Sequence, residues 1–160
     1  MTNLHELHAV NCPYVRAREY LAQMLEPAAL GNRTQRLTLH APVAHVPGEL
    51  QKDVLVRYAA GTDPMHFDQP WRVSWAPAGG GAYPTFAGEL TVRADEDYGT
   101  AILELDGAYT PPLGAAGRAF DYAIGHSIAS ATAQSLLQSI AAEMKQRYDT
   151  EEAAKKQAAR

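Results

Sequence analysis

Apolar and polar residues alternate along much of the chain, and this alternation is typical of strands with one buried face. Between Lys52 and Ala60, for example, Val54, Val56 and Tyr58 share one side of the predicted strand. Short turns join most of the alternating segments, which favours an antiparallel sheet. The pattern predicts six strands, over Leu4 to Val10, Thr34 to Val43, Lys52 to Ala60, Phe67 to Ala76, Thr85 to Asp95 and Thr100 to Ala108.

Two further segments have the three- and four-residue spacing of amphipathic helices. The first follows Asn11, has Pro13 in its first turn and ends at Gly31-Asn32. The second runs from Ala115 to Tyr148. Because so long a helix is not stable alone in water, it must lie across a large apolar surface. The residues after Asp149 are helix-prone but lack an apolar stripe, so we expect residues 150–160 to form a frayed helical or disordered tail.

The order of these elements is strand, helix, five strands and long helix, which is typical of an α+β protein. We expect a single domain over residues 1–149, in which a curved antiparallel sheet wraps around the long C-terminal helix. A sheet that grips a helix in this way can enclose a small-molecule pocket.

Composition restricts the classes of function. With 160 residues, 46% of them hydrophobic and 20% charged, the chain has the composition of one soluble globular domain. A formal net charge of −4, and the lack of a Lys/Arg cluster before the C-terminal tail, argue against nucleic acid as a partner. A single cysteine, Cys12, excludes an internal disulfide. We recognise no signal peptide and no apolar run long enough to span a bilayer, so the expected location is the cytoplasm.

The C-terminal third also carries a family resemblance. It lies in Thr85-Phe86-Ala87-Gly88-Glu89-Leu90, in Leu105-Asp106-Gly107-Ala108-Tyr109-Thr110-Pro111-Pro112-Leu113-Gly114 and in Phe120-Asp121. Together with the order of elements, these stretches resemble the START-like helix-grip superfamily (SRPBCC, the polyketide-cyclase and birch-pollen-allergen group), in a bacterial branch. The resemblance implies the helix-grip fold, in which some members bind lipids, hormones or polyketides, some catalyse and some act through protein contacts. The short helix pair usual after the first strand is replaced here by one longer helix, which leaves the pocket mouth unassigned.

The long helix has mostly small residues in its first half and bulky ones in its second half. Small residues facing a curved sheet leave volume, so we expect a cavity beside residues 120–132 and a filled core at the other end. The alternative is that the small residues only permit close packing on the sheet, and that the aromatic residues nearby are core. The expected ligand-binding residues are Trp71, Trp75, Phe86, Tyr109, Phe120, Ile124, Ser127, Ile128 and Ala131.

Candidates for acid–base chemistry are His66, Asp68 and His126, although each histidine has an ordinary solvated or core interpretation. His5 and His8 are three positions apart in a predicted strand and therefore point to opposite faces, unlike the histidines of a helical zinc motif. We expect no metal and no cofactor.

Three functions are compatible with these patterns. The first, which we expect, is binding of a small apolar or amphipathic molecule in the cavity. The second is a cyclase- or hydrolase-type enzyme acting there, which converging ionisable groups would favour. The third is a protein-interaction module acting as a homodimer, which a filled core and a large exposed apolar patch would favour.

Overall fold

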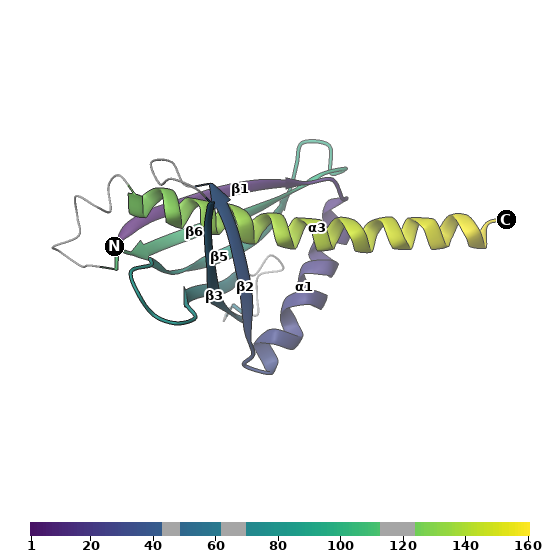
Figure 1. Ribbon diagram of the computed structural model, residues 1–160. Coiled ribbons are helices and arrows are strands. Elements are labelled where there is room, and N and C mark those ends of the chain that lie inside the picture. Colours follow the sequence, from purple (N-terminus) through teal and green to yellow (C-terminus); the bar gives the residue numbers. More distant parts are fainter. Residues whose placement is uncertain (43–48, 62–69, 113–123) are drawn as a thin grey trace.

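Six antiparallel strands form the sheet that organises the protein (Figure 1). The computed structural model describes residues 1–42, 49–61, 70–112 and 124–160. Its strands are β1 (Thr2–Val10), β2 (Thr34–Pro42), β3 (Glu49–Ala59), β4 (Trp71–Pro77), β5 (Thr85–Ala94) and β6 (Ala101–Thr110). Its helices are α1 (Tyr14–Leu30) and α3 (His126–Ala158). The predicted α+β class is confirmed. The predicted starts of the fourth strand at Phe67 and of the long helix at Ala115 lie outside the described residues.

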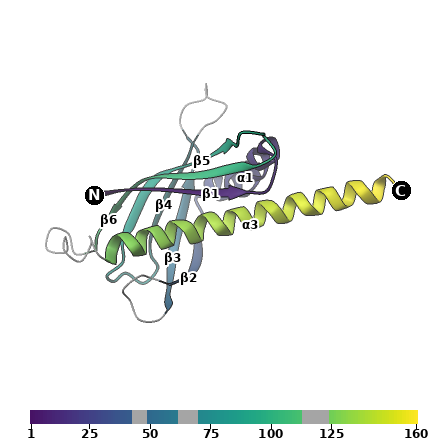
Figure 2. The same cartoon turned by 90° about the horizontal axis from the view of Figure 1, so that it is seen from above.

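The sheet is strongly curved around α3. Its strand order is β1-β6-β5-β4-β3-β2, so β1 and β2 are its opposite edges. In a flat sheet with strands about 4.8 Å apart these edges would be about 24 Å from one another, at least about twice the width of a helix. Helix α3 nevertheless contacts both β1 and β2, as well as β6. Figure 2 shows the strands lying beside α3 along its N-terminal half. The predicted sheet curved around a long C-terminal helix is therefore confirmed.

Alternate residues of the strands face α3 and form the core. On this inner face Val54, Val56 and Tyr58 are buried, as the alternation predicted. Arg57 and Glu104 lie on the outer face, where the Arg57 Nε donates to Thr34 Oγ1 at 3.2 Å and the Arg93 Nε lies 3.2 Å from Glu104 Oε2. The other buried residues of the inner face are Leu4, Val10, Val73, Trp75, Phe86, Leu90, Ala101, Leu103, Leu105 and Tyr109.

Two opposed glycines allow a close approach at the centre of the sheet. Gly88 of β5 is the register partner of Gly107 of β6. A Cβ atom added to Gly107 would lie 2.5 Å from the Ala87 carbonyl oxygen and 2.8 Å from the Phe86 Cζ. The Phe86 ring therefore occupies the space that a side chain at Gly107 would take. From there it stacks on Trp75, with ring centroids 4.2 Å apart and ring planes 14° from parallel.

Helix α1 covers one end of the sheet and contacts β3, β5 and α3. It follows Pro13, which fits the start of a helix because that position needs no N–H donor. Its predicted apolar face is confirmed, since Ala17, Leu21 and Leu25 are buried. The helix ends before Gly31, also as predicted.

Helix α3 buries one stripe of residues at three- and four-residue spacing and then continues past the sheet (Figure 1). The stripe consists of Ile128, Ala129, Thr132, Ala133, Leu136, Leu137, Ile140, Ala141 and Met144. The segment predicted to form a frayed helical or disordered tail, residues 150–160, is helical to Ala158, and its side chains from Ala153 onward are exposed. Within this segment, Glu151 accepts a 2.6 Å hydrogen bond from the Tyr20 hydroxyl of α1.

The inner face of the edge strand β1 contains polar residues between its two buried apolar ones. Leu4 and Val10 are buried there, with Glu6 and His8 half-buried between them. Two side chains of α3 hydrogen-bond the Glu6 carboxylate: the Ser130 hydroxyl donates to Oε1, and the Gln134 amide donates to Oε2 at 3.1 Å. The carboxylate is thus part of the contact between the first strand and the last helix.

Candidate ligand-binding site

A pocket of about 390 Å³ lies between α1, α3, β2 and β3. This volume is within the range of small-molecule sites in proteins. Its wall includes strongly buried apolar side chains: Val56 and Leu25 are each 2% exposed, and Leu136 is 3% exposed. The other apolar lining residues are Met24, Leu37, Tyr58 and Ile140, and the polar ones are Gln23, Gln35, Arg36, Ser139, Glu143 and Arg147. We call these seven apolar lining residues the floor of the pocket, and Gln23, Ser139, Glu143 and Arg147 its rim.

The periodicity of each element brings these residues together. On α3, Leu136, Ile140, Glu143 and Arg147 recur every three or four positions and so share one face of the helix. Gln35 and Leu37 of β2 alternate onto the inner face of the sheet, and Gln35 is the register partner of Val56. Arg36 falls between them on the opposite face, where its guanidinium lies 3.5 Å from the Asp53 carboxylate. We therefore assign the charge of the pocket to Glu143 and Arg147.

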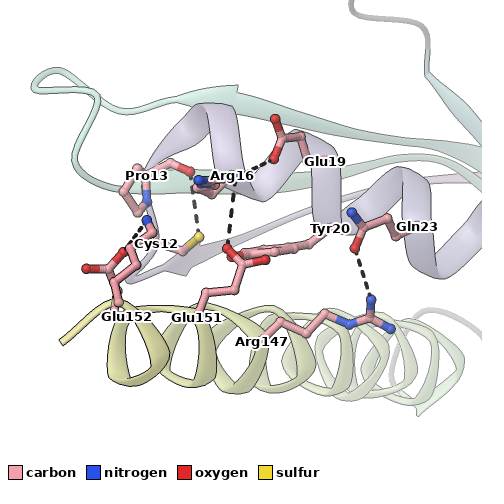
Figure 3. A network of polar contacts seen from close by, with 10 residues as sticks. Cys12, Pro13, Arg16, Glu19, Tyr20, Gln23, Arg147, Glu151 and Glu152 are labelled. Atoms are coloured by element: carbon pink, nitrogen blue, oxygen red, sulfur yellow. Dashed lines mark hydrogen bonds and ion pairs between the residues drawn. The ribbon is translucent and has the colours of Figure 1, made fainter. Parts of the chain in front are cut away.

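Arg147 joins the two helices at the rim (Figure 3). Its Nη2 donates to Glu143 Oε1 at 2.8 Å, an (i, i+4) ion pair along α3. Its Nη1 donates to the Gln23 amide oxygen of α1 at 3.3 Å. The Arg147 side chain is 37% exposed, and its guanidinium is held by groups from both helices.

Tyr58 supplies a hydroxyl to the pocket. Its side chain belongs to the floor and is 6% exposed. Among the described residues no group hydrogen-bonds this hydroxyl. Burial, and secondly the negative charge of Glu143, raise the pKa of Tyr58 well above its ordinary value. The phenol therefore stays protonated at neutral pH and remains a hydrogen-bond donor.

A second cluster of polar side chains holds α1, which forms one wall of the pocket, in place. Tyr20 is buried, and Arg16 pairs with Glu19 at 2.9 Å and lies 3.9 Å from Glu151, the acceptor of the Tyr20 bond (Figure 3). Burial, then the bond to Glu151, raise the pKa of Tyr20. These contacts hold α1 against α3 beyond the pocket.

Cys12 lies beside this group and is fully buried. Burial raises the pKa of its thiol to about 11. Because the thiolate is the nucleophilic form, this thiol is chemically inert near neutral pH.

None of the predicted binding residues in the described ranges lines this pocket. Trp75, Phe86 and Tyr109 are register neighbours across β4, β5 and β6, and all three are buried. Ile128 is buried too, while Trp71, Ile124, Ser127 and Ala131 are half-buried. Phe120 lies outside the described residues, as does much of the segment beside the expected cavity. That cavity beside residues 120–132 therefore stays a prediction.

The same region contains two buried polar features. The Tyr83 hydroxyl and Thr132 Oγ1 are 2.5 Å apart, and Thr132 also donates to the Ile128 carbonyl at 2.7 Å. Trp75 Nε1 is buried without a hydrogen-bond partner among the described residues. Tyr83 was not predicted as a buried residue, because it lies in a loop with no periodic pattern to mark it.

The expected filled core beside the second half of α3 is found on one flank only. Leu137 and Met144 are completely buried, as expected. On the flank that faces β2 and α1, however, Leu136 and Ile140 border the open pocket. Ser139 and the charged pair continue this flank, and such polar side chains do not fill an apolar gap. In the first half, Ala129 and Ala133 are completely buried, which supports the close-packing alternative for these two positions.

The candidate acid–base residues are not brought together in the described part of the chain. His66 and Asp68 lie outside it, and His126 is exposed, with its ring centroid 5.9 Å from that of Tyr109. His5 and His8 point to opposite faces, as predicted; His5 lies 3.6 Å from both Glu104 and Asp106 on the outer face. Within the described ranges no three His, Cys, Asp or Glu side chains are grouped closely enough to hold a metal ion.

Neither described helix is long and apolar enough to cross a membrane. Comparison with protein-family models gives no match for this chain, and comparison with curated proteins gives none either. The relation to known proteins therefore rests on architecture. A six-stranded antiparallel sheet curved around a long C-terminal helix is compatible with the helix-grip fold.

Proposed function

We propose that this protein binds a small amphipathic molecule in the pocket between α1, α3, β2 and β3. The observation that carries the proposal is the combination of a buried apolar floor with a hydrogen-bonding rim in a hollow of about 390 Å³. Ligand sites of this kind bury an apolar body and orient it with a few polar groups. The resemblance to the START-like helix-grip superfamily, whose members include small-molecule carriers, points the same way.

An uncharged fluorescent dye, N-phenylnaphthylamine, tests this proposal. Ser139 is an exposed rim residue of α3, so Ser139→Phe places a ring in the pocket without touching the buried stripe. Gln138→Phe places the same ring at an exposed position outside the pocket lining and is the matched control. We expect Ser139→Phe to weaken dye binding by about tenfold or more and Gln138→Phe to leave it unchanged, with equal thermal midpoints for both variants.

A third variant distinguishes this pocket from the cavity expected beside residues 120–132. Ala131→Leu fills space on the half-buried first part of α3. If Ala131→Leu prevents dye binding and Ser139→Phe does not, the ligand occupies the other cavity and the proposed site is wrong. If the wild-type protein binds no dye and retains no small molecule in native mass spectrometry, the binding function itself is wrong.

A further inference from the structure

We propose that the ligand of this pocket is an organic anion, a compact apolar body that carries one acidic oxygen group, and that Arg147 binds this group. The inference rests on the proposed function, because it concerns the same pocket. It goes further by naming the chemical class of the ligand and the residue that selects it.

Arg147 has hydrogen-bonding capacity left over at the rim. A guanidinium carries five N–H donors in a planar fork, and the described contacts engage one nitrogen with Glu143 and another with Gln23. The fork matches the two oxygens of a carboxylate, so it binds such a group with more directional preference than an ammonium does. Since Arg147 shares its helix face with Leu136 and Ile140, an acid bound there has its apolar part directed at the floor.

The floor offers a second donor. The Tyr58 hydroxyl has no partner among the described residues, although its ring is almost completely buried. Trp75 Nε1, and not this hydroxyl, is the completely buried polar atom without a partner in the described part of the chain. The Tyr58 hydroxyl is therefore accessible from the pocket, where a ligand oxygen can accept its hydrogen bond. Tyr58 and Arg147 together present donors at the floor and at the rim, and both suit a ligand that brings acceptors.

Glu143 already occupies the place at Arg147 that a ligand acid would take. Its carboxylate lies 2.8 Å from Nη2, and the Glu143 side chain, at 49%, is more exposed than that of Arg147. An incoming anion must share Arg147 with Glu143 or displace it. The Glu143 charge therefore opposes anion binding while Arg147 favours it. Neutralising Glu143 should raise the affinity for an anion, and neutralising Arg147 should lower it.

Two dyes with the same apolar body isolate this effect. Anilinonaphthalene sulfonate differs from N-phenylnaphthylamine by one anionic sulfonate, so the ratio of their affinities measures anion selection. We expect Arg147→Gln to lower the ratio of sulfonate to neutral-dye affinity about tenfold, and Glu143→Gln to raise it. Octanoate should compete with the sulfonate dye at lower concentration than octylammonium does.

The chain supplies a matched control. Lys145 and Asp149 form another (i, i+4) ion pair on α3, outside the pocket lining. Lys145→Gln and Asp149→Asn change the net charge by the same amounts as the two test variants, and we expect them to leave the ratio unchanged. Arg147→Lys keeps the charge but loses the fork, and should lower the ratio part of the way.

The outcomes separate this inference from the proposed function. If the neutral dye binds and Ser139→Phe blocks it, but Arg147→Gln and Glu143→Gln shift the ratio in the same direction or not at all, the anion inference is wrong and the pocket stands. Stronger competition by octylammonium than by octanoate also overturns the anion inference. If neither dye binds the wild-type protein, both proposals are wrong.

Discussion

Replacing Gly107 by alanine tests whether the sheet depends on the close approach of β5 and β6. The new Cβ would lie 2.5 Å from the Ala87 carbonyl oxygen and 2.5 Å from the Gly88 Cα, both of them backbone atoms that no side-chain rotation can move. Relieving such an overlap costs up to about 3 kcal/mol. Alanine also lowers the entropy of the unfolded chain, which offsets about 0.4–1 kcal/mol of this. We therefore expect the free energy of unfolding to fall by about 2 kcal/mol.

Urea denaturation followed by circular dichroism measures this change, and for a chain of this size the thermal midpoint should drop by about 4–8 °C. Gly79→Ala is the control, because no atom lies within 4 Å of a Cβ built there. It should be neutral or slightly stabilising. A Gly107→Ala protein as stable as the wild type would show that the close packing of β5, β6 and the Phe86 ring is not required.

Three other predictions concern buried polar groups. Thr132→Val leaves the Tyr83 hydroxyl buried without a partner and should lower the free energy of unfolding by about 1–3 kcal/mol. The double variant with Tyr83→Phe should lose less stability than the sum of the two single variants. Additive losses in urea denaturation would contradict this. Tyr20→Phe removes the 2.6 Å bond to Glu151 and should lower stability by about 1–2 kcal/mol, whereas Tyr98→Phe, at a residue 67% exposed, should not; equal urea midpoints for the two variants would refute the role of the bond. The pKa of Cys12 is raised from 9.0 to about 11 by burial, so the unfolded chain loses this proton first and the free energy of unfolding should fall as pH rises from about 9 to about 11. Cys12→Ala should remove that part of the slope in denaturation curves measured across this pH range, and an unchanged slope would contradict the assignment.

The strands were predictable because a sheet with one buried face requires apolar and polar residues to alternate along each strand, and this pattern is visible within a short segment of sequence. Val54, Val56 and Tyr58 alternate with polar residues, and the structure buries these three. The same holds for Leu103 and Leu105 of β6. No comparable local signal marks how sharply the sheet bends. The bend depends on α3 meeting both edge strands, and α3 comes after all six strands along the chain.

The described pocket was not predictable, because its residues look ordinary when each element is considered alone. Glu143 and Arg147 have the spacing of a solvated helical ion pair. Only the approach of Gln23 from α1 makes Arg147 part of a rim shared by two helices. One signal was present in the sequence: Ser139, Glu143 and Arg147 follow one another at four-residue spacing beside the apolar stripe of α3. Such a polar line next to a buried stripe indicates a helix flank that the sheet does not cover.

The pairing of β1 with β6 has a consequence for synthesis of the chain. Val10 pairs with Ala101 and Thr2 with Tyr109, so β1 cannot pair until β6, the last of the six strands of this sheet, has been made. At about 5–20 residues per second, this wait lasts about 5–18 seconds. During that time β1 has neither its partner strand nor α3. Its inner face is interrupted by Glu6 and His8, and charged or polar residues within an apolar strand hinder pairing with a wrong partner. We expect the Glu6 carboxylate to disfavour such mispairing. Once α3 is made, Ser130 and Gln134 supply the hydrogen bonds that allow the same carboxylate to be half-buried.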